Sequence, residues 1–141
     1  MFTTAGRAIN AYVKTGIETA IPEADPHRLI LMLFEGALAS IAQARLKLST
    51  GDIPGRGKAI SKAISIIQDG LRTSLDTQKG GELAQRLSSL YEYVTMRLLE
   101  ANAYARQDAL DEAAHLISEL HSGWTAITPS KHACVRGMLI A

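Results

Sequence analysis

The feature that most constrains the fold is the spacing of apolar residues, which recurs every three or four positions along four separate stretches of the chain. Such spacing places the apolar side chains on one face of an α-helix. The four stretches cover about residues 26–48, 56–76, 82–105 and 108–127, with glycine- or proline-containing breaks at most of their boundaries. Short connections force successive helices to pack as antiparallel neighbours. The sequence therefore predicts an all-α fold, an antiparallel up-down four-helix bundle with an N-terminal arm or short helix.

The same pattern divides the chain into three parts. Residues 1–24 carry only sparse apolar positions, which predicts a mobile N-terminal arm or cap. Asp25 followed by Pro26 is a strong helix start, because an acidic N-cap and a proline in the first turn both favour it. We expect the bundle to span residues 25–127, with Asp108 as the cap of the fourth helix. Residues 128–141 return to no period and are predicted to form a C-terminal tail.

Charge and composition limit the classes of partner and the cellular location that we expect. The 141 residues include 15 Lys or Arg and 14 Asp or Glu, a net charge of +1 that gives no electrostatic reason to expect nucleic acid or an anionic membrane as partner. No uninterrupted apolar run reaches the roughly 18 residues of a membrane span, and no secretory signal precedes the first helix. The single cysteine, Cys134, excludes an internal disulfide. We therefore expect a soluble, cytoplasmic protein with no membrane insertion.

Catalytic and cofactor motifs are the next test. A di-metal helical bundle needs Glu-x-x-His on two helices, and the sequence contains that spacing once, at Glu112 and His115. The glycines at 51–57 lack the strand and the Lys-Ser or Lys-Thr pair of a phosphate-binding loop. Cys134 has His132 nearby but no third group to orient it. We expect no enzyme and no cofactor; a metal-dependent bundle using Glu112 and His115 is the rival that metal analysis of the purified protein would decide.

The first helix has more apolar surface than a bundle core requires. Residues 29–34 are six consecutive apolar residues, which cover the whole circumference of the helix. A bundle helix needs an apolar stripe only a little over 100° wide. Either this helix is central and packed on several sides, or its Leu31 and Met32 side receives another helix from the arm or from a partner.

The second and third helices present a similar excess. On the second helix, Ala59, Ala63, Ile66 and Gly70 form a flank of small or modest bulk, which either a neighbouring bundle helix or a partner helix can fill. On the third helix, the apolar and aromatic positions span about half the circumference. They include Tyr91, Tyr93, Leu98 and Leu99, and tyrosines bury a ring while offering a hydroxyl at the edge. Together these surfaces favour an interaction module for amphipathic helices. Exposed grooves of this kind need a cover in the free protein, and the arm, with Ile9 and Tyr12 at helical spacing, is the internal candidate.

Several longer blocks are more specific than their periodicity. They are Asn-Ala-Tyr at 10–12, Asp-Pro-His-Arg-Leu-Ile-Leu-Met-Leu-Phe-Glu-Gly-Ala-Leu at 25–38, Gly-Gly-Glu-Leu-Ala at 80–84, Leu-Tyr-Glu-Tyr at 90–93, Arg-Leu-Leu-Glu-Ala-Asn at 97–102, and Trp124. In this order and spacing the sequence resembles the flagellar export chaperone family FliS, over about residues 8–127. Residues 131–141 have no counterpart in that pattern.

The resemblance implies a cytoplasmic chaperone of the bacterial flagellar type III secretion system. Members of the family bind the disordered C-terminal segment of flagellin, which becomes helical on the bundle, and so prevent premature filament assembly before export. The arm around Tyr12 would occupy part of that site and move out on binding. Other flagellar proteins, such as an anti-sigma factor, a co-chaperone or the export gate, are further candidate partners. The predicted partner-binding residues are Ile9, Tyr12, Leu31, Met32, Ala59, Ile66, Gly70, Tyr91, Tyr93, Leu98, Leu99 and Asn102.

Two other interpretations stay open at this point. The surplus grooves can be the subunit interface of a homo-oligomerising bundle, or the chain can be an adaptor for another amphipathic helix. The sequence does not decide between a monomer and a homodimer.

Overall fold

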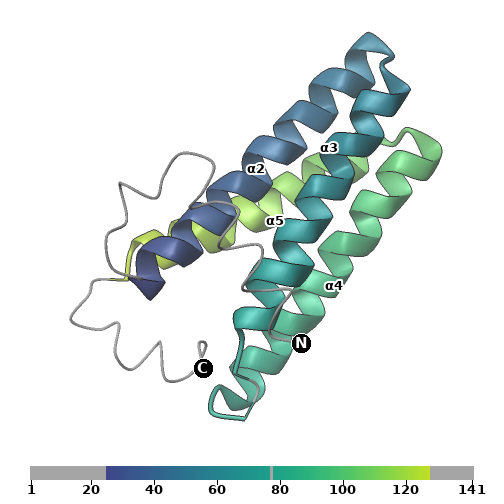
Figure 1. Ribbon diagram of the computed structural model, residues 1–141. Coiled ribbons are helices and arrows are strands. Elements are labelled where there is room, and N and C mark those ends of the chain that lie inside the picture. The colour runs from purple at the N-terminus through teal and green to yellow at the C-terminus, as the bar shows by residue number, and fades with distance from the viewer. Residues whose placement is uncertain (1–24, 77, 128–141) are drawn as a thin grey trace.

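The computed structural model of the chain describes residues 25–76 and 78–127 (Figure 1). Within these residues there are helices and turns but no strand. The main helices are α2 (Pro26–Thr50), α3 (Ile53–Ser65), α4 (Gly81–Tyr104) and α5 (Gln107–Thr125). α3 is prolonged by two short helical turns of different pitch, η2 (Ile66–Leu71) and η3 (Arg72–Ser74).

The four helices form a closed ring of neighbours. α2 packs against α3, α3 against α4, α4 against α5, and α5 returns to α2. Successive helices run in opposite directions along the long axis of the molecule (Figure 1). The predicted all-α, antiparallel four-helix bundle is therefore confirmed.

The start of α2 follows the local signal in the sequence. The carboxylate of Asp25 accepts a hydrogen bond from the backbone N–H of His27 at 3.2 Å, and Pro26 stands in the first turn, where its missing N–H costs nothing. The helix ends at Gly51, whose φ of 78° is a left-handed conformation that glycine adopts without strain. The observed end lies two residues beyond the predicted one.

The start of the second helix differs from the prediction. Asp52 caps α3 by accepting a hydrogen bond from the N–H of Gly55 at 2.9 Å, so the helix begins at Ile53 rather than near residue 56. Gly55 and Gly57 therefore lie inside a helix and do not interrupt it. A Cβ at position 55 would collide with the Asp52 carboxylate, so glycine at this position leaves room for the cap.

The end of this helix changes pitch. η2 is a π-helical turn and η3 a 3₁₀ turn, which disturbs the regular ladder of backbone hydrogen bonds. Two hydroxyls compensate: Thr73 donates to the carbonyl of Asp69 and Ser74 donates to the carbonyl of Gly70, both at 2.6 Å. The helical path thus continues to Ser74, two residues short of the predicted end.

The prediction for the start of the fourth helix was wrong. The N-cap of α5 is Arg106, and Asp108 lies in the first turn. There the Asp108 carboxylate accepts hydrogen bonds from the Arg106 guanidinium at 2.9 and 2.6 Å. A negative charge in the first turn interacts favourably with the helix dipole, but Asp108 is not the N-cap of α5.

The core consists mainly of aliphatic side chains and alanines, as the low aromatic content requires. Fully buried large residues from all four helices include Ile41, Ile60, Leu98, Leu110 and Ile117. Alanines with no exposed surface stand between them, and their small side chains let the helix axes approach closely; they are Ala37, Ala44, Ala63, Ala84, Ala101, Ala109 and Ala113.

Contacts between the first and last helices close the ring at one end. The ring of His27 stacks on Trp124 with centroids 5.3 Å apart. The indole N–H of Trp124 donates to the carbonyl of His27 at 3.0 Å, and Nε2 of His27 lies 2.9 Å from the carbonyl of Trp124. One turn before Trp124 on α5, Nε2 of His121 lies 3.1 Å from the Glu35 carboxylate on α2.

Among the described helices, α2 alone is long and apolar enough to cross a membrane by length and composition. One third (33%) of its most apolar 18-residue window is buried inside the bundle. A core helix that packs against two neighbours, as α2 does against α3 and α5, passes the same test.

Candidate functional site

A groove of about 650 Å³ runs between α2 and α3 on the surface of the bundle. Its floor and walls are made largely of small residues, which are Gly36, Ala39 and Ser40 on α2 and Gly55 and Ala59 on α3. Residues with little bulk keep the groove open and let a third helix approach closely. The predicted flank residue Ala59 therefore lies in the groove.

Met32 lies on the same face of α2 as the groove residues, one turn before them. It stands four residues before Gly36 and seven before Ala39, a spacing that puts all three on one helix face. Its side chain is half-buried, as is that of Leu31. Leu31 packs against the core, which agrees with a helix that contacts neighbours on more than one side.

Lysines form the rim of the groove. Lys47, Lys58 and Lys62 line it, and the ammonium group of Lys47 lies 3.3 Å from the Asp52 carboxylate. Within the described part of the chain, neither Lys58 nor Lys62 forms a salt bridge. The groove is thus apolar and small-residue at its base, with positive charge along its edge.

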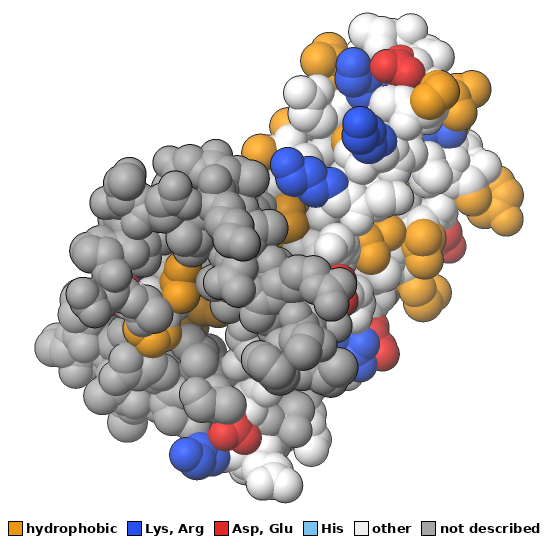
Figure 2. All heavy atoms as spheres, viewed as in Figure 1, with side chains coloured by type: hydrophobic (Ala, Val, Ile, Leu, Met, Phe, Trp, Pro, Cys, Tyr) orange, Lys and Arg blue, Asp and Glu red, His pale blue; other side chains and the backbone are white. Residues whose placement is uncertain are grey.

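The outer face of α4 is a second apolar surface. Met96 and Leu99 are 59% and 54% exposed, and Ala103, also exposed, continues the same face at helical spacing. Tyr93 and Tyr104 add exposed rings on the same helix. Hydrophobic side chains gather on the side of the molecule where α4 lies (Figure 2). A helix that presents large apolar residues to solvent over several turns is typical of an interaction surface.

Other predicted residues lie in the interior. Leu98 has no exposed surface, and Ile66 and Tyr91 are 4% and 3% exposed. Burial raises the pKa of the Tyr91 phenol. Gly70 is also buried, and a Cβ built there would lie 3.1 Å from the Leu33 side chain. At Gly70 the small-residue flank of the second helix is therefore in contact with the bundle's own α2, whereas at Ala59 it borders the open groove.

Asn102 connects two helices. Its side-chain oxygen accepts a hydrogen bond from Nε of Arg56 at 3.2 Å, and its backbone carbonyl accepts one from Nη2 at 3.0 Å. Gly57 lies beside it, where an added Cβ would come within 3.7 Å of the Asn102 amide. The residue thus ties the start of α3 to the end of α4.

An ionic cluster joins α4 to α5 around Arg97. The Arg97 guanidinium contacts Glu100 and Glu112 at 2.7 Å each and Asp108 at 3.7 Å. The Tyr93 hydroxyl donates to the Glu112 carboxylate at 2.9 Å. That hydrogen bond and Arg97 hold the pKa of Glu112 below its ordinary value, and the same carboxylate raises the pKa of Tyr93.

This cluster bears on the metal-dependent alternative. The carboxylate of Glu112 is engaged with Tyr93 and Arg97, while Nε2 of His115 lies 3.4 Å from Glu119 on its own helix. Across residues 25–76 and 78–127, no three His, Cys, Asp or Glu side chains converge in a way that could hold a metal ion. Within the described residues, Glu112 and His115 thus have no third residue beside them that could complete a set of metal ligands.

Comparison with known families decides the identity of the bundle. Residues 8–131 match the sequence model of the family described as flagellar protein FliS. This chain belongs to the FliS family.

Named relatives agree with that assignment. The FliS-family chain is 45% identical over 129 residues to the flagellar secretion chaperone FliS of Salmonella typhimurium, covering 92% of this chain and 94% of the relative. It is 45% identical over 124 residues to the flagellar secretion chaperone FliSB of Pseudomonas aeruginosa, covering 88% and 98%. Identity to FliS of Escherichia coli is 37% over 128 residues, covering 89% and 94%. The predicted family is thereby confirmed, and these relatives are named as chaperones rather than as enzymes.

The predicted partner-binding residues of this FliS-family chain fall into four groups. Ala59 lines the groove and Met32 lies on the same face of α2, whereas Tyr93 and Leu99 lie on the exposed side of α4. Leu31, Ile66, Gly70, Tyr91, Leu98 and Asn102 are wholly or partly buried between helices. Ile9 and Tyr12 lie outside the described residues. Contact with a partner stays a prediction for all of them.

The structure adds residues that sequence reasoning missed. Gly36 and Ala39 face the groove, and the lysines at 47, 58 and 62 line its rim. A signal was available: Met32, Gly36, Ala39 and Gln43 are spaced by four, three and four, which defines a second stripe on the first helix beside its core stripe. It went unnoticed because small residues contribute little to an apolar pattern.

Proposed function

We propose that this chain is a cytoplasmic export chaperone that binds the C-terminal segment of flagellin, prevents its premature polymerisation and supports its export by the flagellar type III secretion system. Membership of the FliS family gives the class of function, and the small-residue groove between α2 and α3 is the observation that carries the binding mode. An amphipathic helix binds in such a groove by placing its apolar face on the floor. The exposed Met96–Leu99 face of α4 supplies a second surface for a client that wraps around the bundle.

The energetics suit a carrier that must also release its client. A disordered segment that folds on binding buries roughly 1,000–3,000 Å² and loses a few kcal/mol to ordering, which limits its affinity. Release at the export apparatus then needs only a competing interaction. In this proposal the chaperone itself performs no chemistry.

Titration of the full chain with the C-terminal peptide of the cognate flagellin tests the proposal. We expect a 1:1 complex and a gain in helical circular dichroism as the peptide folds. No binding at micromolar concentrations would refute flagellin as the client. A complex without added helicity would refute the helix-in-groove mode.

A substitution in the groove locates the binding surface. Ala59→Leu fills the groove with an apolar side chain and should weaken binding at least tenfold, because it blocks close approach of the client backbone; tenfold corresponds to about 1.4 kcal/mol. Ala42→Leu makes the same change at an exposed position of α2 that does not line the groove. Equal affinities of the two variants would place the client elsewhere.

The arm has its own test within this proposal. We infer that Ile9 and Tyr12 cover part of the client surface in the free protein and move out on binding. Deletion of residues 1–20 should then increase the binding of a hydrophobic dye and change the affinity for the flagellin peptide. Unchanged solubility, dye binding and affinity would show that the arm is not the cover.

The homo-oligomer alternative rests on the same apolar surfaces. Sedimentation of the free protein and of its mixture with the flagellin peptide separates the two functions. A chaperone should shift to a complex of one chain and one peptide. A tight dimer that is indifferent to the peptide would favour the oligomerising bundle.

A further inference from the structure

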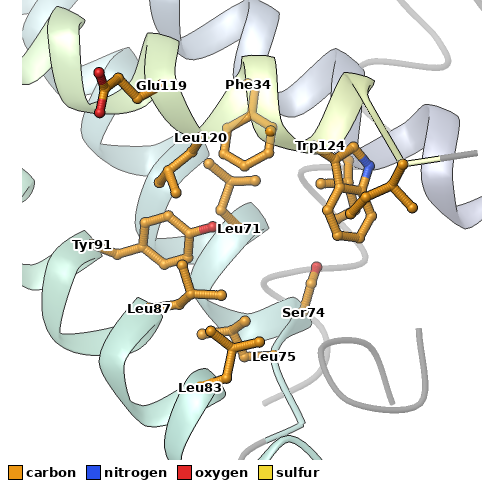
Figure 3. Close-up of a pocket in the computed structure, with 13 residues that line it drawn as sticks. Phe34, Leu71, Ser74, Leu75, Leu83, Leu87, Tyr91, Glu119, Leu120 and Trp124 are labelled. Carbon is orange, nitrogen blue, oxygen red and sulfur yellow. The ribbon is translucent and has the colours of Figure 1, made fainter. Parts of the chain in front are cut away.

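A second cavity, separate from the α2–α3 groove, lies at the end of the bundle where α2 begins and α5 ends. Its volume is about 290 Å³. Side chains from α2, η2, η3, α4 and α5 line it, and Figure 3 shows Phe34, Leu71, Leu87, Tyr91, Leu120 and Trp124 among them. The lining is almost entirely apolar. An engineered apolar cavity of about 150 Å³ takes up benzene, so this one has room for more than one aliphatic side chain.

The position of the pocket points to the chain's own tail as the occupant. Ile127 forms part of the wall and is the last residue that the structure describes. The chain therefore leaves for residues 128–141 directly from the pocket. A dozen residues span up to about 40 Å when extended, far more than a return to the pocket requires.

The sequence of the tail suits this pocket. Met138, Leu139, Ile140 and Ala141 form the longest uninterrupted apolar run outside the described residues. Lys131 and Arg136 precede the run, and residues 128–141 contain no acid. The acid of the pocket lining is Glu119, whose carboxylate points away from the rings in Figure 3, so it can meet the basic residues at the rim.

The segment also lies outside the part of the chain that matches the family. The family match ends at residue 131, so the apolar run lies beyond it. The apolar residues of the arm are instead spaced for one face of a helix, which suits an elongated groove better than a compact pocket.

We propose that the apolar run Met138–Ile140 docks into the end pocket of its own chain. The docked run covers the lining that is still exposed, above all Leu83, and the small exposed part of Trp124, as the hydrophobic effect favours. The pocket is then an intramolecular binding site, specific to a chain with this tail, at the end of the bundle from which α2 starts.

Two unique residues provide the test. Trp124 is the one tryptophan of the chain and lines the pocket, and Cys134 is the one cysteine and lies four residues before Met138. A nitroxide attached to Cys134 through a disulfide quenches tryptophan emission only at short range. In the full chain we expect the label to quench Trp124 and a reductant to restore the emission. Absence of quenching would overturn the proposal.

Variants separate docking from mere proximity. The double substitution Leu139→Asp and Ile140→Asp should abolish the quenching and shift the emission of Trp124 to longer wavelength. Leu83→Glu, at a half-exposed pocket position on α4, should have the same effect from the other side. Leu46→Glu is the matched control, since Leu46 is similarly exposed but lies near the far end of α2. Quenching that survives in the Asp variant, or is lost equally in both Glu variants, would overturn the proposal.

The same fluorescence measurement distinguishes two other possible occupants of the pocket. If the arm filled the pocket, Val13→Asp with Ile17→Asp would shift the Trp124 emission and the tail variant would not. If a second copy supplied the tail, quenching would fade on dilution. Either result would refute docking within one chain, and neither depends on flagellin binding.

Discussion

Single side chains cap the starts of α2 and α3, and Asp25 is the clearer case. Asp25→Ala should lower the free energy of unfolding by about 1 kcal/mol, because it removes the oxygen that accepts from the N–H of His27. Urea denaturation followed by circular dichroism measures the change. Asp25→Ser keeps a capping oxygen and should recover most of the stability; equal losses in the two variants would show that the cap contributes little.

Glu112 makes the stability of the fold depend on pH. Its pKa is lowered by the Tyr93 hydroxyl and by Arg97, so the carboxylate stabilises the fold while ionised, and that stability is lost as the pH falls through its folded-state pKa. The melting temperature should therefore fall between about pH 5 and pH 3, with a shallower slope in Glu112→Gln. Glu82→Gln is the control, because its exposed pair with Arg86 contributes little. Identical slopes in wild type and Glu112→Gln would contradict the prediction.

At the scale of elements, the junction of α3 and α4 depends on Arg56 and Asn102. A double-mutant cycle of Arg56→Ala and Asn102→Ala should show a coupling of about 1 kcal/mol, since Asn102→Ala removes the hydrogen bond from Nε of Arg56 to the Asn102 side chain, while the one to the backbone carbonyl stays available. Unfolding free energies of the four proteins give the value. The exposed pair Glu82 and Arg86 should couple by only about 0.3–0.5 kcal/mol. Strictly additive effects of Arg56→Ala and Asn102→Ala would mean that the contact does not stabilise the bundle.

The existence of each helix could be predicted from the sequence, but not all their boundaries. Apolar spacing is a property of a whole stretch, so it survives local irregularity. The start of α3 was missed because Gly55 and Gly57 count as helix breakers, whereas the side chain of Asp52 supplies a cap that a propensity argument does not weigh. The π turn at Ile66–Leu71 was missed for the opposite reason: Ile67, Leu71 and Leu75 are spaced by four, which fits a normal helix as well as a wider one.

The candidate site could be predicted only in part. Sequence reasoning found residues that have little bulk or extra apolar surface, but not which of them a neighbouring helix covers. Gly70 and Ala59 belong to one flank, yet Leu33 packs against Gly70 while Ala59 stays at the groove. That difference depends on how α2 and α3 cross, and the residue pattern of one helix carries no information on the crossing.

At the scale of the whole molecule, the bundle of residues 25–127 should be an independent unit. The described hydrophobic core and the capped starts of α2 and α3 lie within that span, so the excised fragment should keep its helical circular dichroism per residue and unfold cooperatively in urea. A broad, non-cooperative transition would show that the arm or the tail is part of the folded core.

The contacts between His27 and Trp124 can form only after almost the whole chain has been synthesised. The two residues are separated by 97 positions, and closing a loop of that length costs about 4 kcal/mol of chain entropy before its contacts form. During synthesis the N-terminal end of the chain emerges first, so α2 leaves the ribosome long before Trp124, which it contacts in the folded protein. The apolar face of α2 that packs against α5 therefore stays without this packing partner until nearly the whole chain has been made. A chaperone of this family is thus itself at risk of misassociation for most of its own translation.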